Sequence, residues 1–382
     1  MTANPMTANP TASDPLMAGI RSFGAAHRYY QGPGAAALTG ACVAALGRHP
    51  VLVCDAIVHG LLDTTVRDSC AAQGLDLHWL EVTGDVTRDA VDALIAGATR
   101  EGARPDVVIA AGGGKGVDTG KAVSRALGAR LVVLPTSASN DGPCSKAFVY
   151  YDADHQLLSV EQLTRNPDTV IVDTALLVRA PRALLVSGIG DALCKLYEGD
   201  QVRAAGGRNL MGGTSTLAAQ ALSLACDRAI RDNAVTGLAA LDAGKPDPAF
   251  ERLTEALVLL AGLAFENSGL SIAHSMTRGL PLLPGVATTL HGLQVAYGLF
   301  VQWMLEDRSA GFLAEQASLY RAVGLPWTLA ALGATQVDDA LIDTVAEHVM
   351  RSPHIGHFAR PLAAVDIAQA MRRAERFTPS SH

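Results

Sequence analysis

The first half of the chain alternates short apolar runs with stretches whose apolar residues recur at helical spacing. This alternation is typical of βαβ units built around a parallel sheet. It predicts an α/β region over residues 22–173, with a helix over 87–101 that has Asp89 in its first turn. After residue 150 the polar segment DADHQ predicts a hairpin. The predicted strands span residues 51–55, 75–82, 106–111, 131–135 and 169–173.

From Pro181 onward the pattern becomes helical, with Ala, Leu and charged residues at helical spacing and Gly and Pro at the joints. The sequence therefore predicts an α/β domain over residues 21–180 and an all-helical domain over 181–382, with a ligand cleft between them.

The chain starts with a repeated MTANP pentapeptide and has no basic, apolar leader pattern. We expect residues 1–20 to be a disordered tail rather than a signal peptide.

The 382-residue chain is weakly acidic and has few charged residues. Thirty Lys and Arg against 37 Asp and Glu leave a net charge of -7, which argues against a general nucleic-acid binder. Only 18% of the residues are charged and 49% are hydrophobic. We therefore expect a globular chain that buries part of its apolar surface in a homo-oligomer. The six cysteines lack metal or redox spacing, and no run approaches the ~20 apolar residues that cross a bilayer. These features predict a cytoplasmic protein with no membrane partner.

Residues 107–123 read VVIAAGGGKGVDTGKAV, which is an apolar strand, a glycine cluster and a helix. Glycines let a backbone approach a phosphate closely, and a helix N-terminus offers unpaired N–H groups to the anion. The segment matches neither GxGxxG nor the P-loop, since Lys115 precedes Gly rather than Ser or Thr. A tight strand-to-helix turn without a ligand is an equally ordinary interpretation. Lys115 beside the turn favours a pyrophosphate site.

The stretch GGGKGVDTGKAVS and the later LVVLPTSASNDGPCSKAFVYYD resemble the glycerol dehydrogenase branch of the iron-containing (group III) alcohol dehydrogenases. Further matching blocks run in the family's order through most of the chain: RYYQGPGA, RNPDTVIVDT, GIGDAL, GLSIAHSMTRGL and LHGLQVAYG. The resemblance implies a dehydroquinate synthase-like architecture, with an α/β NAD-binding domain and an all-α domain that binds metal and substrate. It also implies an NAD-dependent dehydrogenase acting on a small polyol or α-hydroxy ketone.

Asp191, His274 and His291 match the three positions that hold a divalent metal in this family. Taken alone they are ordinary, because a lone His in an apolar helix is more often structural and an Asp after GIG is often a helix cap. The two histidines are too far apart in sequence to share one helical turn. The resemblance implies a Zn²⁺ or Fe²⁺ ion that acts as a Lewis acid on the alcohol oxygen, with His274 at the catalytic centre.

The resemblance also implies the contacts to NAD. Asp55, at the end of the strand 51–55, would accept hydrogen bonds from the ribose hydroxyls and repel a 2′-phosphate, which favours NAD over NADP. An ordinary turn residue at a strand end is the alternative for Asp55. The other positions that match cofactor contacts are Gly113, Gly114, Lys115, Asp118, Thr136, Ser139, Ser145, Ala147 and Tyr151.

Asp141 and Arg278 are the candidate substrate residues. Asp141 matches the acidic residue that contacts glycerol in the family, which gives it a catalytic role, whereas Asn-Asp before Gly-Pro also makes an ordinary turn. Arg278 departs from the family: relatives commonly read HAIHNGL where this chain reads HSMTRGL. The added cation leads to the hypothesis of a substrate larger or more anionic than glycerol, with a surface ion pair as the alternative. His354 and His357 have no third metal ligand nearby in sequence, and we expect them to lie in a loop that has a structural role or lines the cleft.

Three functions compete for this sequence. The first is a metal- and NAD-dependent polyol dehydrogenase. A sugar-phosphate cyclase or a glycerol-1-phosphate dehydrogenase shares the fold and cofactors but needs basic residues for a substrate phosphate, and few lie in the metal segments. A catalytically inactive nucleotide-binding protein is the third, and the intact metal triad argues against it. A homo-oligomer, from dimer to octamer, is expected in each case.

Overall fold

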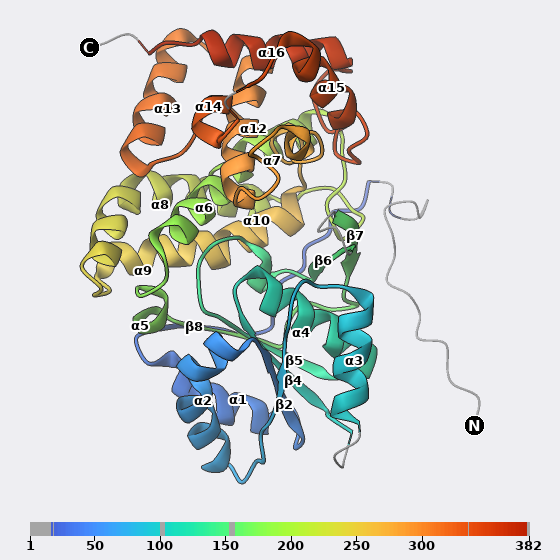
Figure 1. The fold of residues 1–382 in the computed structure, drawn as a ribbon, viewed down its shortest axis with the longest axis vertical. Coiled ribbons are helices and arrows are strands. Elements are labelled where there is room, and N and C mark those ends of the chain that lie inside the picture. The colour runs from blue at the N-terminus through green and yellow to red at the C-terminus, as the bar shows by residue number, and fades with distance from the viewer. Residues whose placement is uncertain (1–16, 18, 100–103, 153–156, 335, 380–382) are drawn as a thin grey trace.

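The computed structural model describes residues 17, 19–99, 104–152, 157–334 and 336–379. It has a sheet flanked by helices and, above it in Figure 1, a helical part. The strands in the described ranges lie between Tyr29 and Asp173, and the elements that follow are helical. The predicted fold class is confirmed. The tail predicted over residues 1–20 falls mostly on residues outside the described ranges.

The main sheet is parallel and has the strand order β1-β8-β5-β4-β2-β3. Its strands are β1 Tyr29–Gly32, β2 Pro50–Cys54, β3 His78–Glu81, β4 Val107–Gly112, β5 Arg130–Pro135 and β8 Thr169–Asp173. Every residue of β2, β4 and β8 is buried, as expected for a sheet covered on both faces. Because the strands are parallel, their carboxyl ends meet at one edge, where ligands of such sheets bind.

Helices cover both faces of this sheet. Neighbouring residues of β4 point to opposite faces, so Val108 belongs to one buried core and Ile109 to the other. The Ile109 face packs on α1 Thr39–Ala44 and α2 Ala56–Ala71, and the Val108 face packs on α3 Arg88–Ala98 and α4 Gly114–Leu127.

A separate antiparallel hairpin lies at the junction of the two parts (Figure 1). It pairs β6 Ala147–Tyr151 with β7 Leu157–Gln162. The hairpin confirms the prediction made after residue 150, and residues 153–156 of its predicted turn lie outside the described ranges.

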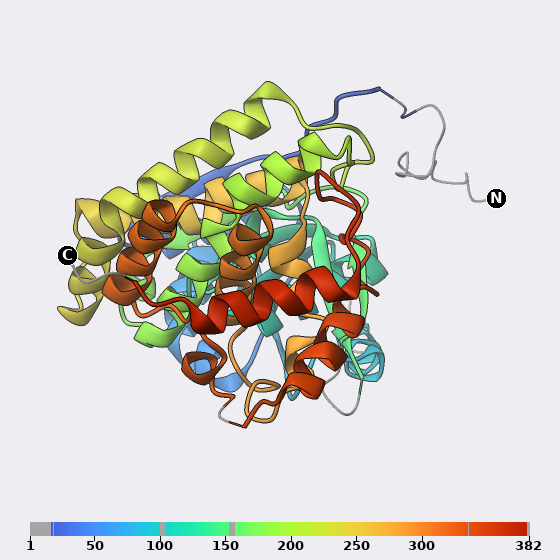
Figure 2. The ribbon, with the colours of Figure 1, turned by 90° about the horizontal axis from the view of Figure 1, so that it is seen from above.

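The helical part follows β8, and Figure 2, which is seen from above, shows its last helix, α16, in red across the middle of the view. The central helix is α12, which is buried along most of its length and packs against α6, α11 and α16. The helices are α5 Thr174–Leu177, α6 Arg182–Leu193, α7 Lys195–Ala204, α8 Leu217–Asp242, α9 Pro248–Glu255, α10 Ala261–Ser268, α11 Ile272–Met276, α12 His291–Leu305, α13 Ala310–Val323, α14 Leu329–Leu332, α15 Asp339–Val349 and α16 Ala364–Arg376. Shorter turns are η2 Ala35–Leu38, η3 Gly142–Cys144, the π-helical η4 Ala256–Leu260 and η5 Leu280–Leu282.

Apart from shifts of one residue at the ends of β4 and β5, the strand prediction differs from the structure in three places. The strand β1 was not predicted; it has only four residues, which are half-buried, and it pairs with β8 alone. The strand predicted over 75–82 is shorter, because β3 is an edge strand whose ladder with β2 starts only at His78. Asp55 lies just beyond β2, where it caps α2.

Among the described residues no single helix is long and apolar enough to cross a membrane. One pair of segments, Pro248–Ser268 with Ile272–Leu282, passes on length and composition together but is bent by 92°.

Candidate metal and cofactor site

Asp191, His274 and His291 come together between the helical part and the edge of the sheet. Each offers one ligand atom, and these atoms all lie within 4.8 Å of one another. Asp191 is buried near the end of α6, His274 is half-buried on α11, and His291 is the exposed first residue of α12. Two imidazoles and one carboxylate suit Zn²⁺ or Fe²⁺, and the exposed His291 leaves the cluster accessible from one side. The residues present therefore fit a divalent cation.

Glycines allow α6 and α12 to approach closely enough to form this cluster. A Cβ atom at Gly292 would lie 1.8 Å from the backbone oxygen of Ser187, and one at Gly190 would lie 2.3 Å from the backbone oxygen of Gly292. Both distances are far below van der Waals contact, so neither position accepts a side chain without moving a helix. Since Asp191 and His291 are the chain neighbours of these glycines, the close contact brings the two ligands together.

Glu198 orients His274. The Nδ1 atom of His274 lies 2.7 Å from Glu198 Oε2, and its Nε2 atom lies 3.3 Å from Asp191 Oδ1. Glu198 is fully buried, and its Oε1 atom accepts the backbone N–H groups of Ser271 and His274 at 2.8 and 3.0 Å. A carboxylate behind a histidine fixes the ring tautomer and raises its basicity as a ligand. Nε2 is therefore the His274 atom presented to the cluster.

Lys195 is a buried cation that the sequence analysis did not single out. Its side chain is 1% exposed, and its Nζ atom lies 2.7 Å from Asp141 Oδ2 and 3.0 Å from Asp191 Oδ1. The ring of Phe265 lies over the same ammonium, 5.6 Å away. The backbone N–H of Asp141 donates to Asp191 Oδ2 at 3.2 Å. The predicted substrate residue and the predicted metal ligand thus share one ammonium group.

The charges around Asp191 determine its protonation state. Burial raises the pKa of Asp191, but Lys195, His274 and His291 together hold it well below its usual range. Asp191 is therefore a carboxylate. Part of His291 reaches solvent, yet the surrounding protein limits its hydration and lowers its pKa to about 4. The His291 ring is consequently neutral near pH 7 and has a lone pair for a metal.

Glu198 and His274 form a charged pair. Burial lowers the pKa of His274, but the neighbouring Glu198 carboxylate raises it well above its usual range. Burial likewise raises the pKa of Glu198, but His274 brings it down to about 2. A metal ion bound at Nε2 would therefore have to displace a proton from a strongly held imidazolium.

The glycine turn follows β4 at the carboxyl edge of the sheet. Gly113 is the N-terminal cap of α4 and makes no side-chain capping bond. A Cβ atom at Gly116 would lie 2.2 Å from the backbone oxygen of Ala111, so the turn folds tightly against the strand. Gly114 is the first residue of α4, and the exposed Lys115 pairs with Asp85. This N-terminus has the backbone geometry expected of a pyrophosphate site.

Asp55 lies at the same edge of the sheet. It follows β2, which pairs directly with β4, and its Oδ1 atom accepts the backbone N–H of Val58 at 2.9 Å. The structure therefore brings Asp55 and the glycine turn to neighbouring strand ends.

A loop between β5 and β6 carries more of the predicted residues, and the fully buried Lys121 of α4 anchors it. The Nζ atom of Lys121 donates to the backbone oxygens of Gly142 and Ala147, each at 2.7 Å. It also lies 3.4 Å from the hydroxyl of Ser145, which itself donates to Ala147 O. Ser145 is fully buried, so in this structure its hydroxyl is bonded within the protein.

The remaining predicted cofactor residues surround this loop. The backbone N–H of Thr136 donates to Gly112 O at 3.0 Å, which ties the end of β5 to the glycine turn. The backbone oxygen of Ser139 accepts a hydrogen bond from Ser187 of α6 at 3.2 Å. Asp118 accepts the backbone N–H of Val149 at 3.3 Å, and burial raises its pKa to about 6. Tyr151 ends β6, and its backbone N–H donates to Val86 O.

Arg278 is exposed just after α11, and within the described ranges no carboxylate forms an ion pair with it. His354 lies within electrostatic range of Arg278 and His274, and burial together with His274 lowers its pKa to about 4. The Nδ1 atom of His357 lies 2.8 Å from Leu270 O, so the loop of the two histidines packs against the start of α11.

A sequence signal for Lys195 and Glu198 exists but is weak. The two residues follow Asp191 at i+4 and i+7, which places all three on one side of the α6–α7 stretch. Charged residues at such spacing in an otherwise apolar helix are candidates for a buried ionic cluster. An exposed helical face gives the same pattern, which is why the spacing alone does not identify them.

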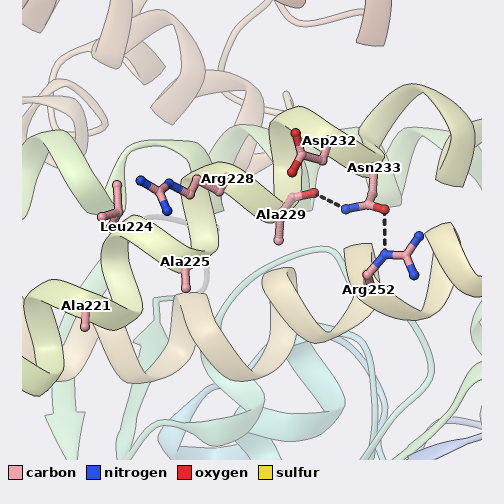
Figure 3. Close-up of a pocket in the computed structure, with 8 residues that line it drawn as sticks. All are labelled: Ala221, Leu224, Ala225, Arg228, Ala229, Asp232, Asn233 and Arg252. Atoms are coloured by element: carbon pink, nitrogen blue, oxygen red, sulfur yellow. Dashed lines mark hydrogen bonds between the residues drawn. The ribbon is translucent and has the colours of Figure 1, made fainter.

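A large open groove lies elsewhere on the molecule. It has a volume of about 640 Å³ and runs along α8 beside α9. In Figure 3, Asn233 lies between Ala229 O and Arg252 Nε, to which it is hydrogen-bonded at 2.8 and 2.9 Å. None of the residues that line this groove belongs to the metal cluster or the glycine turn.

The comparisons with known proteins point in one direction. Residues 26–174 match the family model for iron-containing alcohol dehydrogenase. A glycolaldehyde reductase of Halobacterium salinarum is 35% identical over 319 residues, which cover 84% of this chain and 87% of the relative. A glycerol dehydrogenase of Thermotoga maritima is 36% identical over 273 residues, which cover 71% of this chain and 75% of the relative.

Solved structures give the same result. A probable glycerol dehydrogenase from Sinorhizobium meliloti superposes with a TM-score of 0.87 at 32% identity, covering 93% of this chain and 98% of that one. Glycerol dehydrogenase from Schizosaccharomyces pombe superposes with a TM-score of 0.89 at 29% identity, covering 93% and 90% of the two chains. The chain therefore belongs to the iron-containing alcohol dehydrogenase family, in its glycerol dehydrogenase branch, and is an oxidoreductase.

Proposed function

We propose that this protein is a metal-dependent enzyme that transfers a hydride between NAD(H) and a small polyol or α-hydroxy ketone. The observation that carries the proposal is the meeting of Asp191, His274 and His291 within 4.8 Å of one another. Asp191 is also bonded to the loop that begins beside the glycine turn. A metal site and a pyrophosphate site on opposite sides of one loop would put the reacting carbon near a nicotinamide ring.

The metal would be held by Asp191, by Nε2 of His274 and by His291. A divalent cation there supplies Lewis-acid chemistry, lowering the pKa of the substrate hydroxyl so that its carbon can give up a hydride. Glu198 fixes the His274 ring, and the contact of α6 with α12 holds Asp191 beside His291. We propose Zn²⁺ or Fe²⁺, both of which suit this donor set.

NAD would lie along the carboxyl edge of the sheet. The N-terminus of α4, from Gly113 through Lys115, would hold the pyrophosphate, and Asp55 would accept the ribose hydroxyls. Thr136, Ser139, Ala147 and Tyr151 lie on the segments beside this turn. Ser145 would act by tying the end of the loop to β6, where its hydroxyl donates to Ala147 O, and Asp118 of α4 would act by holding β6 through the backbone N–H of Val149.

Asp141 would orient the substrate. Its carboxylate is held beside Asp191 by Lys195, at a position where it can accept a hydrogen bond from a second hydroxyl of the substrate. Arg278 would lie farther out, where an anionic end of a larger substrate could meet it. The relatives named glycerol dehydrogenase and glycolaldehyde reductase support a small hydroxylated substrate.

The test is a substrate panel read by NADH formation with metal-loaded protein. We expect glycerol or another vicinal diol to be oxidised at a kcat/KM well above that of a mono-alcohol of equal length. Reduction of dihydroxyacetone and glycolaldehyde by NADH tests the reverse direction. If neither the polyols nor these carbonyl compounds change the NADH concentration, the proposed function is wrong.

The Arg278 hypothesis has its own measurement within the same panel. Arg278→Ala is expected to lower kcat/KM for a hydroxy acid while leaving that for glycerol close to the wild-type value. An unchanged kcat/KM for each accepted hydroxy acid and polyol would show that Arg278 does not select the substrate.

A further inference from the structure

One oxygen of Asp191 has two competing neighbours. His274 Nε2 lies 3.3 Å from Oδ1, and Lys195 Nζ lies 3.0 Å from the same atom. The other oxygen, Oδ2, accepts the backbone N–H of Asp141. Since Nε2 is the ring nitrogen presented to the cluster, Oδ1 is the oxygen that a cation shared by Asp191 and His274 would meet. Lys195 therefore contacts the atom through which Asp191 would bind a metal.

Lys195 has no solvent-exposed alternative to this position. Its side chain is 1% exposed, its ammonium also contacts Asp141 at 2.7 Å, and the Phe265 ring lies over it. Separating a buried ammonium from its carboxylate partners carries a large desolvation cost. Lys195 consequently keeps its charge next to the cluster when a cation enters, and repulsion between the two cations opposes that entry.

The same ammonium balances the charge of the metal-free protein. Asp141 and Asp191 are both buried, and the backbone N–H of Asp141 donates to the carboxylate of Asp191. Without Lys195, the two carboxyl groups would face each other with less positive charge to offset them, which is costly in a buried site. Removal of the ammonium should therefore weaken the metal-free fold and strengthen the attraction for a divalent cation.

We propose that Lys195 is a built-in counter-ion of this site, which offsets part of the charge of Asp141 and Asp191 in the metal-free protein and weakens the binding of a divalent cation to Asp191, His274 and His291. The inference rests on the metal site of the proposed function. It assigns Lys195 a positioning and affinity-setting role, so that the bound metal is exchangeable rather than permanently held.

The experiment compares zinc affinity in four full-length proteins: wild type, Lys195→Met, Asp141→Asn, and the double variant with both changes. Each is stripped of metal and titrated with Zn²⁺ in competition with a colorimetric chelator. We expect Lys195→Met to bind zinc at least about tenfold more tightly than wild type, because a neighbouring positive charge has been removed. In the Asp141→Asn background, loss of Lys195 should likewise tighten zinc binding. The zinc affinity of the double variant should be within about threefold of that of wild type.

Thermal unfolding supplies a second readout that does not depend on activity. Metal-free Lys195→Met is expected to have a lower Tm than metal-free wild type. Added Zn²⁺ should raise the Tm of the variant by more than it raises that of wild type. Lys245→Met is the matched control, because it removes the same charge from a residue beyond the end of α8. Its metal-free Tm and the rise in Tm with Zn²⁺ should both equal those of wild type. If Lys195→Met fails to fold without metal, the comparison of Asp141→Asn with the double variant tests the same change.

Equal or weaker zinc binding after loss of Lys195, in either background and in protein with a native circular dichroism spectrum, would overturn the inference and leave the proposed metal site intact. Absence of zinc binding in all four proteins would instead overturn the proposed metal site, and the inference with it.

Discussion

Glu198 is not one of the three proposed metal ligands, but it contacts one of them, His274. It is fully buried, it contacts His274 Nδ1, and it accepts two backbone N–H groups at the start of α11. The same carboxylate thus fixes the His274 ring and the backbone that carries it. A partner of this kind raises the basicity of the histidine ligand, so its charge contributes to metal affinity.

Glu198→Gln is predicted to weaken zinc binding by about tenfold, because the variant keeps the shape of the side chain but loses the charge behind His274. The chelator competition titration measures this directly. Glu251→Gln is the matched control, since Glu251 also accepts side-chain hydrogen bonds, from Gln31 and Thr174, but lies outside the cluster. Equal zinc affinities for the two variants would refute a role for the Glu198 charge.

Glu266 is another buried carboxyl group, and it lies outside the metal cluster. It is fully buried on α10, where it accepts hydrogen bonds from the backbone N–H of Lys146 and from Asn166. Burial raises the pKa of Glu266 from 4.5 to about 7, and these hydrogen bonds limit the rise. Between pH 4.5 and about pH 7, Glu266 in the folded protein therefore holds a proton that the same residue has released in the unfolded chain.

Protonation of Glu266 therefore favours the folded state. Its contribution to the free energy of unfolding, on the order of 3 kcal/mol, is complete below about pH 4.5 and is lost as the pH rises through about 7. Glu266→Gln, which cannot ionise, should flatten this part of the pH dependence. Urea unfolding of both proteins at about pH 5.5 and about pH 8 measures the difference. Parallel pH profiles for the two proteins would show that Glu266 is ionised in the fold throughout.

At this scale the sequence predicted the chemistry only with help from the resemblance. Asp191, His274 and His291 have no informative spacing, because they meet through three different helices. The glycine turn could be singled out from its position after an apolar strand of a predicted parallel sheet, whereas the role of Asp55 was implied only by the resemblance. The role of Lys195 depends on the loop of Asp141, which lies far from it in the sequence.

At the scale of elements, the contact between α6 and α12 is what assembles the site. The backbone oxygens of Ser187 and Gly292 occupy the space that side chains at Gly292 and Gly190 would need. Helices rarely pack this closely without glycine. The close contact, and not helix propensity, therefore requires glycine at these two positions.

Gly292→Ala is predicted to destabilise the fold by about 1–3 kcal/mol and to weaken zinc binding, because the added methyl group pushes α12 and His291 away from α6. Gly60→Ala is the control: it lies in α2, and a Cβ atom there would meet no neighbouring element within 4 Å. That variant should gain about 0.5–1 kcal/mol from helix propensity, with zinc binding unchanged. Unfolding curves with and without Zn²⁺ measure both effects, and an unaltered zinc affinity in Gly292→Ala would contradict the role given to this contact.

Elements with a continuous apolar run were predictable. Residues 107–112 and 130–135 form central strands that are buried by helices on both faces, so their sequences are almost wholly apolar. The edge strand Tyr29–Gly32 has no such run, because it is half-buried and pairs on one side only. Short edge strands depend on their partner for their conformation, which local sequence does not record.

At the scale of the whole molecule, two parts with different architectures share one site. The sheet edge supplies the glycine turn and Asp55, the helical part supplies the three proposed metal ligands, and the loop of Asp141 joins them. The division into domains near residue 180 and the homo-oligomer remain predictions. Exposed Leu217, Leu224 and Val235 on α8 are consistent with a surface that a second copy would cover.

The proposed activity depends on a metal held by Asp191, His274 and His291. The most direct measurement strips the protein of metal with a chelator, verifies the loss by elemental analysis, and follows NADH formation from glycerol or the best diol while Zn²⁺ or Fe²⁺ is returned in steps. We predict that the metal-free protein is inactive and that the rate rises in proportion to the bound metal until each chain holds one ion. A metal-free protein that still forms NADH at the original rate would contradict this dependence.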